Sequence, residues 1–235
     1  MSYGIQIINQ QNLIQIDENY SNYQLYSSGI RTTSDVYPYT FLQAPVNSLL
    51  LIRPITYESN IFWVCDRRKY STKVEYMVSA LGPTPFGSSG NYPYVKNYYY
   101  MLFVDSSLIA DQTPQNFGFG LNVYKPNTKL AYSSNIATVP FIQNTYISSN
   151  TSQTISIAAP IGKTAYVEVS AIGRYGFADI FNGFNYDSMG CYNGIRFLNN
   201  TTAYYDPIYW FEGNDVYGGD VSDWFFPKHI NFGAY

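Results

Sequence analysis

The feature that most constrains the fold of this chain is the regular return of turn-forming residues between short β-prone runs. Val, Ile, Tyr, Phe and Thr fill the runs, and Gly, Pro, Asn, Asp and Ser separate them at intervals of roughly 8–12 residues. No segment keeps a sustained helical period, and a single helical turn is expected within residues 105–115. The chain is therefore predicted to be all-β: one or more antiparallel β-sandwiches built from short strands and hairpins, with little or no helix.

One sequence pattern occurs three times, at residues 4–17, 120–133 and 194–206. Each copy has a Gly, an apolar residue, a polar residue and two apolar residues, followed by a turn and a second short strand. Each copy is predicted to be a β-hairpin. Structural kinship and chance resemblance both account for the recurrence. If the copies are related, they are expected at equivalent corners of related sheets.

Further strands are expected wherever β-formers gather. Residues 48–53 and 61–65 are continuous apolar runs, which are typical of strands buried on both faces. The charged residues at 66–69 are predicted to form a solvated turn in preference to a phosphate site. Residues 82–93 and 173–190 are expected to be long exposed loops. The remaining strands are predicted at 20–30, 74–78, 98–104, 139–147, 153–158, 164–170 and 208–211.

The length of 235 residues is enough for one sizeable core or two small ones. The best internal boundary lies near Thr113-Pro114. We therefore predict an N-terminal β-sandwich half, residues 1–112, and a C-terminal β-sandwich half with an aromatic tail, residues 113–235. One compact domain is the alternative.

Composition restricts the classes of function open to the chain. Charged residues make up 12% and aromatic residues 19%. With a net charge of −3 and no basic run, nucleic acid is not an expected partner. Low charge combined with many β-formers favours self-association. We therefore expect a protein that works in an assembly or outside a cell.

The cysteines and the hydropathy pattern exclude two further classes. Cys65 and Cys191 are too few for a disulfide framework and match no metal motif, so two buried thiols are favoured over a bridge. No apolar run approaches the roughly 20 residues of a membrane helix. The N-terminus lacks the pattern of a secretory signal. We expect no membrane span and synthesis in a cytoplasm.

Few residues in the chain are suited to catalysis. His229 is the one histidine, and no Gly-x-Ser-x-Gly elbow accompanies it. Glycoside hydrolysis would need two acids held about 5–9 Å apart, and Ca²⁺ would need several carboxylate oxygens. Solvated acids and a polar turn are favoured over both, so no enzyme activity, metal or cofactor is expected. The candidates weighed are Glu168, Asp179, Asp187, Asp206 and Glu212 for hydrolysis, and Glu212, Asp215, Asp220 and Asp223 for calcium.

The first two hairpin copies share more than a β pattern. The chain opens with Tyr3-Gly4 before an alternating strand, and the middle copy has Phe119-Gly120 in the same position and Ser133-Ser134 at its end. These motifs resemble small virion proteins of tailed bacteriophages, which commonly open with Tyr-Gly-apolar-polar-apolar, a turn, and a strand ending in Asp-Ser or Ser-Ser. The first copy departs from that pattern in its Gln-rich turn. The resemblance implies a structural component of the tail, tail tip, baseplate or fibre, and it names no catalytic residue.

The primary hypothesis is therefore a non-enzymatic phage tail protein of the virion. It would form a symmetric oligomer and join other tail proteins through β edges, aromatic surfaces and the loops at 82–93 and 173–190. The alternative is a carbohydrate- or receptor-binding module, with Tyr209, Trp210 and Trp224 as platforms for a host surface glycan. A glycoside hydrolase is a third hypothesis. The expected interface residues are Tyr3, Trp224, Phe225, Phe226, Phe232 and Tyr235.

Overall fold

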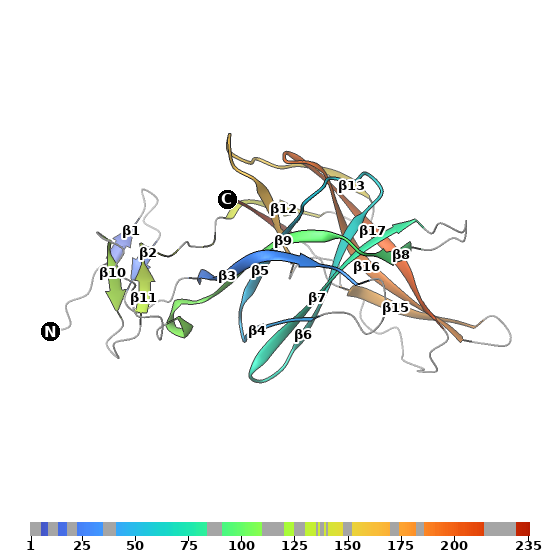
Figure 1. Cartoon of the computed structure of the whole chain (residues 1–235), viewed down its shortest axis with the longest axis horizontal. Helices are drawn as coiled ribbons and strands as arrows, with labels where there is room; N and C mark the ends of the chain where they lie inside the picture. Colours follow the sequence, from blue (N-terminus) through green and yellow to red (C-terminus); the bar gives the residue numbers. More distant parts are fainter. Residues whose placement is uncertain are drawn as a thin grey trace.

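Two large β-sheets packed face to face form the body of the protein in the computed structural model (Figure 1). The structure describes residues 6–8, 14–17, 23–34, 41–83, 91–109, 120–124, 130–134, 136, 139, 141–147, 152–169, 174–181, 186–213 and 229–235. The prediction of an all-β fold with antiparallel sheets is confirmed. Ser106–Leu108 form a single 3₁₀ turn, η1, within the segment where a helical turn was predicted.

The six-stranded sheet is antiparallel throughout. Its strands, in spatial order, are β12 (Phe141–Tyr146), β18 (His229–Ala234), β14 (Ala165–Glu168), β5 (Leu49–Pro54), β9 (Asn97–Asp105) and β3 (Tyr23–Thr32). β12 and β3 are therefore its two edges among the described strands.

The eight-stranded sheet is built around the long hairpin of β6 and β7. Its strands, in spatial order, are β13 (Gln153–Ser156), β17 (Thr202–Gly213), β8 (Asn91–Tyr94), β7 (Lys73–Pro83), β6 (Phe62–Lys69), β16 (Tyr186–Asn199) and β15 (Arg174–Phe181), with β4 (Phe41–Pro45) beside β7. β17 also pairs with β16, so the path of paired strands closes on itself. The β17–β8 pairing is parallel and the others are antiparallel.

The main core fills the space between the two sheets. β5 shows how the sequence builds it, because its continuous apolar run has Leu50 and Ile52 in this core and Leu51 in a second cluster on the other face. The prediction that residues 48–53 are buried on both faces is thus confirmed. The hydroxyl of Tyr76, from the opposite sheet, donates a hydrogen bond of 2.6 Å to the carbonyl of Ser48, which fixes the two sheets together at the start of β5.

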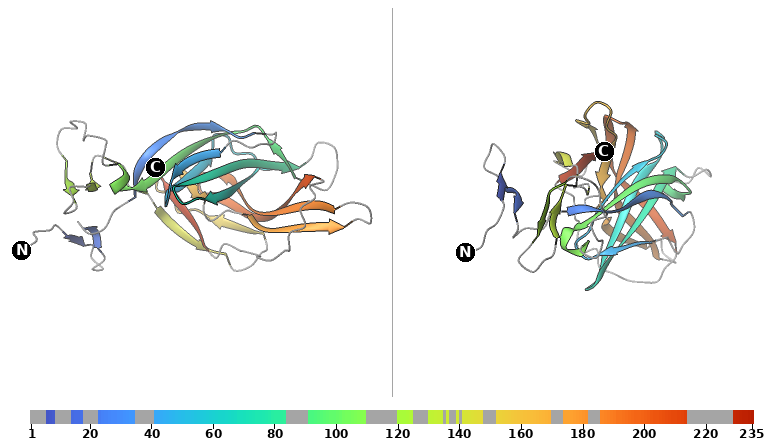
Figure 2. Two further views of the ribbon diagram at one scale, coloured as in Figure 1. Left: turned by 90° about the horizontal axis from the view of Figure 1, so that it is seen from below. Right: turned by 60° about the vertical axis from the view of Figure 1, so that its left-hand side comes forward.

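Two of the three predicted hairpins have the same register. β1 (Gln6–Ile8) with β2 (Ile14–Asp17), and β10 (Asn122–Tyr124) with β11 (Leu130–Ser133), form separate two-stranded sheets. Both lie at the same end of the molecule, beyond the large sheets (Figures 1 and 2). The ladders correspond residue for residue and shift at the same step: Gln6–Asp17 and Asn122–Ser133, Ile7–Ile16 and Val123–Tyr132, then Ile8–Ile14 and Tyr124–Leu130.

The third hairpin differs from the first two. It is the β16–β17 hairpin of the eight-stranded sheet, in which Arg196 pairs with Tyr204 and Asn199 with Thr202 across a shorter turn. The expectation of three equivalent corners is therefore wrong for this copy. Local β pattern predicts a hairpin, but it does not determine whether that hairpin stands apart or joins a larger sheet.

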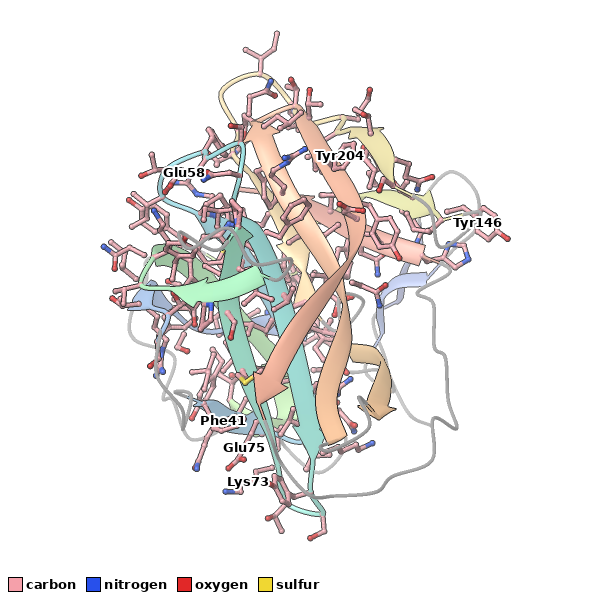
Figure 3. All side chains as sticks on the ribbon, turned by 90° about the vertical axis from the view of Figure 1, so that its right-hand side faces the viewer. Phe41, Glu58, Lys73, Glu75, Tyr146 and Tyr204 are labelled. Carbon is pink, nitrogen blue, oxygen red and sulfur yellow. The ribbon has the colours of Figure 1, made fainter. Side chains whose placement is uncertain are left out.

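Two segments expected to be irregular are strands. The charged residues at 66–69 continue β6 and pair with residues 74–77 of β7, so the turn falls after Lys69. Charges are accommodated there because Arg67 and Lys69 are exposed where the hairpin projects; Figure 3 shows Lys73 and Glu75 at this end. Residues 173–190 form most of the β15–β16 hairpin, because backbone pairing does not require a lasting apolar period.

The predicted loop at 82–93 also begins and ends in strand. Gly82 and Pro83 belong to β7, and residues 91–93 belong to β8. Residues 84–90 lie outside the described part of the chain.

Strands from both predicted halves are interleaved in each large sheet. In the six-stranded sheet, β14 from the second half pairs with β5 from the first, and in the eight-stranded sheet β16 pairs with β6. The pairing of the described strands therefore shows no domain boundary between residues 112 and 113. One compact domain describes it better than two sandwich halves.

Candidate functional site

The outer face of the six-stranded sheet, which points away from the main core, carries a cluster around Arg53. Arg53 ends the apolar run of β5 and pairs with Tyr99 of β9. Its guanidinium carbon lies 4.3 Å from the centre of the Tyr99 ring and 5.6 Å from that of Tyr166 on β14. Such cation–π stacking holds a guanidinium in place.

Exposed apolar side chains lie at both ends of the row of the sheet that contains this arginine. Ile30 of edge strand β3 pairs with Tyr99 and is 56% exposed. At the other edge, Phe141 pairs with Gly233, the partner of Tyr166, and is 44% exposed. We call Ile30, Tyr99, Arg53, Tyr166 and Phe141 the Arg53 patch.

Tyr235 lies next to the patch. Its backbone exchanges two hydrogen bonds of 3.0 Å with Thr164, which extends the β14–β18 pairing by one step. Since Phe232 faces the main core, alternation places Tyr235 on the outer face, where it is 52% exposed. The Lys163 ammonium lies 6.0 Å from its ring centre.

A polar row crosses the same face beside the patch. His229 Nδ1 lies 2.6 Å from Asn144 Oδ1, Asn144 Nδ2 donates to Asn231 Oδ1 at 2.6 Å, and Asn231 Nδ2 donates to Glu168 Oε2 at 3.4 Å. Because an amide oxygen only accepts, the His229 Nδ1 carries the hydrogen and every donor in the row points toward the Glu168 carboxylate. The row ties the edge strand β12 through β18 to β14.

The exposed end of the polar row is aromatic. The rings of Tyr146 and His229 lie 5.5 Å apart, and Tyr146 is exposed on the edge strand β12, as Figure 3 shows. The other end is buried, since Glu168 is only 3% exposed. The row therefore joins a buried carboxylate to an exposed edge.

The Arg53 patch has the composition of a protein interface. Aromatic residues and arginine are enriched in the cores of such interfaces, whereas Lys, Asp and Glu are depleted. The described residues contain no group of three His, Cys, Asp or Glu that could hold a metal ion. Glu168 is part of the polar row, and Asp206 accepts a hydrogen bond from Ser152.

The structure separates the predicted interface residues. Tyr235 is exposed beside the patch, but Phe232 is fully buried in the main core, so its assignment to a partner surface is wrong. Phe232 packs edge-on against Phe197 with ring centres 6.5 Å apart. Tyr3, Trp224, Phe225 and Phe226 lie outside the described residues.

Other predicted residues are placed only in part. Tyr209 and Trp210 belong to β17, but their side chains, with those of Asp179, Asp187, Glu212 and Cys191, are outside the described part. The glycan platform therefore stays a prediction. Asp215, Asp220 and Asp223 lie outside the described residues, and Cys65 is a buried thiol as predicted.

Sequence reasoning missed Arg53, Asn144 and Asn231. Arg53 reads as the polar end of a buried strand, and asparagines are common in the turns of this chain. The one available signal was that Arg53 is the single charge in an apolar run. Its neighbours across the sheet come from distant parts of the sequence, so no local pattern could assemble the patch.

Fold and site together define an all-β sandwich protein with a row of aromatic and apolar side chains across the outer face of one sheet, exposed at its two edges. No family model, curated protein or solved structure matches the chain. Within the described ranges, no helix is both long enough and apolar enough to cross a membrane.

Proposed function

We propose that the protein is a non-enzymatic structural component of a bacteriophage tail apparatus that assembles with itself and with other tail proteins. The observation that carries the proposal is the Arg53 patch, in which exposed Ile30 and Phe141 flank a stacked arginine. Large apolar side chains exposed at both edges of one sheet face, with aromatic residues and an arginine between them, fit a protein interaction site.

The edges of the six-stranded sheet support the same function. β3 is a ten-residue strand with exposed Tyr26 and Ile30, and Arg31 is its only charged residue. Natural proteins usually protect such an edge with lysine, proline or a covering segment, because an open edge pairs with other chains. A protein made to assemble can use this edge.

The phage location rests on the resemblance of the hairpin motifs. The matching registers of the β1–β2 and β10–β11 hairpins support the motif as a real structural unit, since two copies that are far apart in the chain adopt one ladder. The virion remains the proposed location on this ground.

The test is the solution mass of the full chain, measured by size-exclusion chromatography with light scattering. We expect a defined oligomer that Ile30→Lys and Phe141→Lys reduce to a monomer, because each places a charge in the patch. Ile161→Lys is the matched control, since Ile161 is a fully exposed apolar residue in a turn and belongs to no strand. A monomer at every concentration, or equal loss in the control, would contradict the proposal.

A further inference from the structure

Arg53 is prepared to bind a carboxylate. Its Nε is buried and has no hydrogen-bond partner, and the ion pairs among the described residues are made by Lys73 and Lys96. Glu168, two residues after Tyr166 on β14, accepts a hydrogen bond within the polar row. An arginine stacked on aromatic rings presents a fixed fork of donors that matches a carboxylate in two parallel hydrogen bonds.

The β1–β2 hairpin has the complementary chemistry. Its strands contain Ile7, Ile8, Ile14 and Ile16, and the only charged residues before Arg31 are Asp17, at the end of β2, and Glu18. The hairpin is thus apolar and acidic, whereas the patch is apolar and basic.

This hairpin also needs a partner. β1 and β2 pair with each other and with no other described strand. The β10–β11 hairpin is fixed to the body, because the buried side chains of Ser106 and Gln24 donate hydrogen bonds of 2.6 and 2.8 Å to the carbonyls of Ala131 and Ser133. A two-stranded hairpin alone is marginally stable in water, so the isolated β1–β2 ladder would gain from a partner surface.

We propose that the β1–β2 hairpin of one copy docks on the Arg53 patch of a second copy, with Asp17 accepting hydrogen bonds from Arg53. In its own copy the hairpin lies beyond the end of the sheets (Figure 2), so the contact is intermolecular. Two different surfaces meet in it, so repetition builds a ring or a filament. This contact is one specific way in which the self-assembly of the proposed function can occur, and the inference therefore rests on that proposed function.

Two variants test the contact in the full chain by light scattering. Arg53→Gln removes the charge from the patch, and Asp17→Asn with Glu18→Gln removes it from the hairpin. Each variant alone should be monomeric where the unmodified protein is an oligomer. An equimolar mixture should form a dimer, because it contains one intact hairpin and one intact patch per pair. Arg67→Gln is the matched control, since Arg67 is exposed on β6 and stacked on Tyr76, and it should assemble normally.

The outcomes separate this contact from the proposed function. If the unmodified protein is monomeric, self-assembly itself is overturned. If it is an oligomer and both variants assemble equally well, self-assembly stands and this contact is overturned. Two monomeric variants that do not combine also overturn the contact. Unchanged thermal unfolding of each variant establishes that lost assembly is not lost folding.

Discussion

Phe232 and Tyr235 lie three residues apart at the end of the sequence, yet they have opposite environments. Phe232 on β18 is fully buried between the sheets against Phe197, and Tyr235 is half exposed on the outer face beside Lys163. In the sequence both belong to one aromatic tail. Strand alternation and the pairing of β18 between β12 and β14 separate them.

The two faces of the six-stranded sheet differ in the same way. The inner face is apolar and continuous with the opposite sheet, so its residues determine stability. The outer face has a smaller buried cluster around Leu51, Met101 and Phe103, and beside it the aromatic rings around Arg53 and a polar row, where we propose that recognition takes place. Aromatic content alone therefore does not identify an interface, and the register of each aromatic residue decides its role.

The largest expected effect is that of Phe232→Ala. Removing a fully buried ring should lower the free energy of unfolding by about 3–5 kcal/mol. Urea unfolding followed by tryptophan fluorescence measures it. A loss below about 1 kcal/mol would mean that the inner face tolerates a cavity there, and the contrast with Tyr235 would fail.

A smaller effect is expected for Tyr205→Phe on β17 of the opposite sheet, which tests whether the core between the two sheets excludes water. The Tyr205 hydroxyl donates a 2.7 Å hydrogen bond to Asn193 Oδ1, and its loss should cost about 1 kcal/mol at pH 7. Burial, with a smaller contribution from Asp206, raises the Tyr205 pKa from 10.0 to about 12.

The sign of the pH dependence follows from that pKa. Between about pH 10 and 12 the unfolded chain releases the tyrosine proton before the folded chain does, so stability present below pH 10 is lost as the pH rises. Tyr98 and Tyr76, whose pKa values are also raised by burial, add to this loss. Tyr205→Phe should make the alkaline loss less steep in urea unfolding from pH 7 to 12. An unchanged slope would contradict a core between the sheets that is sealed from water.

The smallest effect on stability is expected for Tyr235→Ala. Its half-exposed ring should contribute less than about 0.5 kcal/mol to the free energy of unfolding, because its backbone pairing with Thr164 is kept. The same variant should weaken self-association, since it removes an aromatic ring beside the Arg53 patch. Thermal unfolding and light scattering on one sample measure both. Strong destabilisation without loss of assembly would mean that Tyr235 stabilises the fold and does not belong to the interface.

These variants are preferred to deleting the aromatic tail. A deletion from Trp224 would remove β18, which lies between β12 and β14. The sheet would lose a central strand and Phe232 together, so lost assembly could not be distinguished from lost folding.

Local sequence signals were sufficient for much of the fold. Apolar runs located β5 and the start of β6, and alternation around turn residues located the β1–β2 and β10–β11 hairpins. These signals depend on neighbours in sequence. The charged residues at 66–69 predicted a turn, but they continue β6. Their pairing with β7 does not depend on whether their side chains are apolar or charged. The β15–β16 hairpin was missed because its Gly- and Asn-rich composition is shared with loops.

The site was less predictable than the fold, for a physical reason. Ile30, Arg53, Tyr99, Tyr166 and Phe141 come from five strands, and each is unremarkable among its sequence neighbours. Only the register across β3, β9, β5, β14, β18 and β12 brings them into one row. No local pattern in a single sequence predicts the register between strands that are far apart in the chain.

The place of β18 between β12 and β14 has a consequence for folding kinetics. β14 and β12 are complete before β18 in chain order, yet they cannot join one sheet until β18 inserts between them. Such non-local pairing is slow, because the entropy lost in closing the intervening chain comes before the free energy gained from the new contacts. During that interval the facing edges of β12 and β14 are open, and either can capture a neighbouring molecule. We therefore expect refolding yield to fall as protein concentration rises, with the insertion of β18 as the step at which folding and aggregation compete.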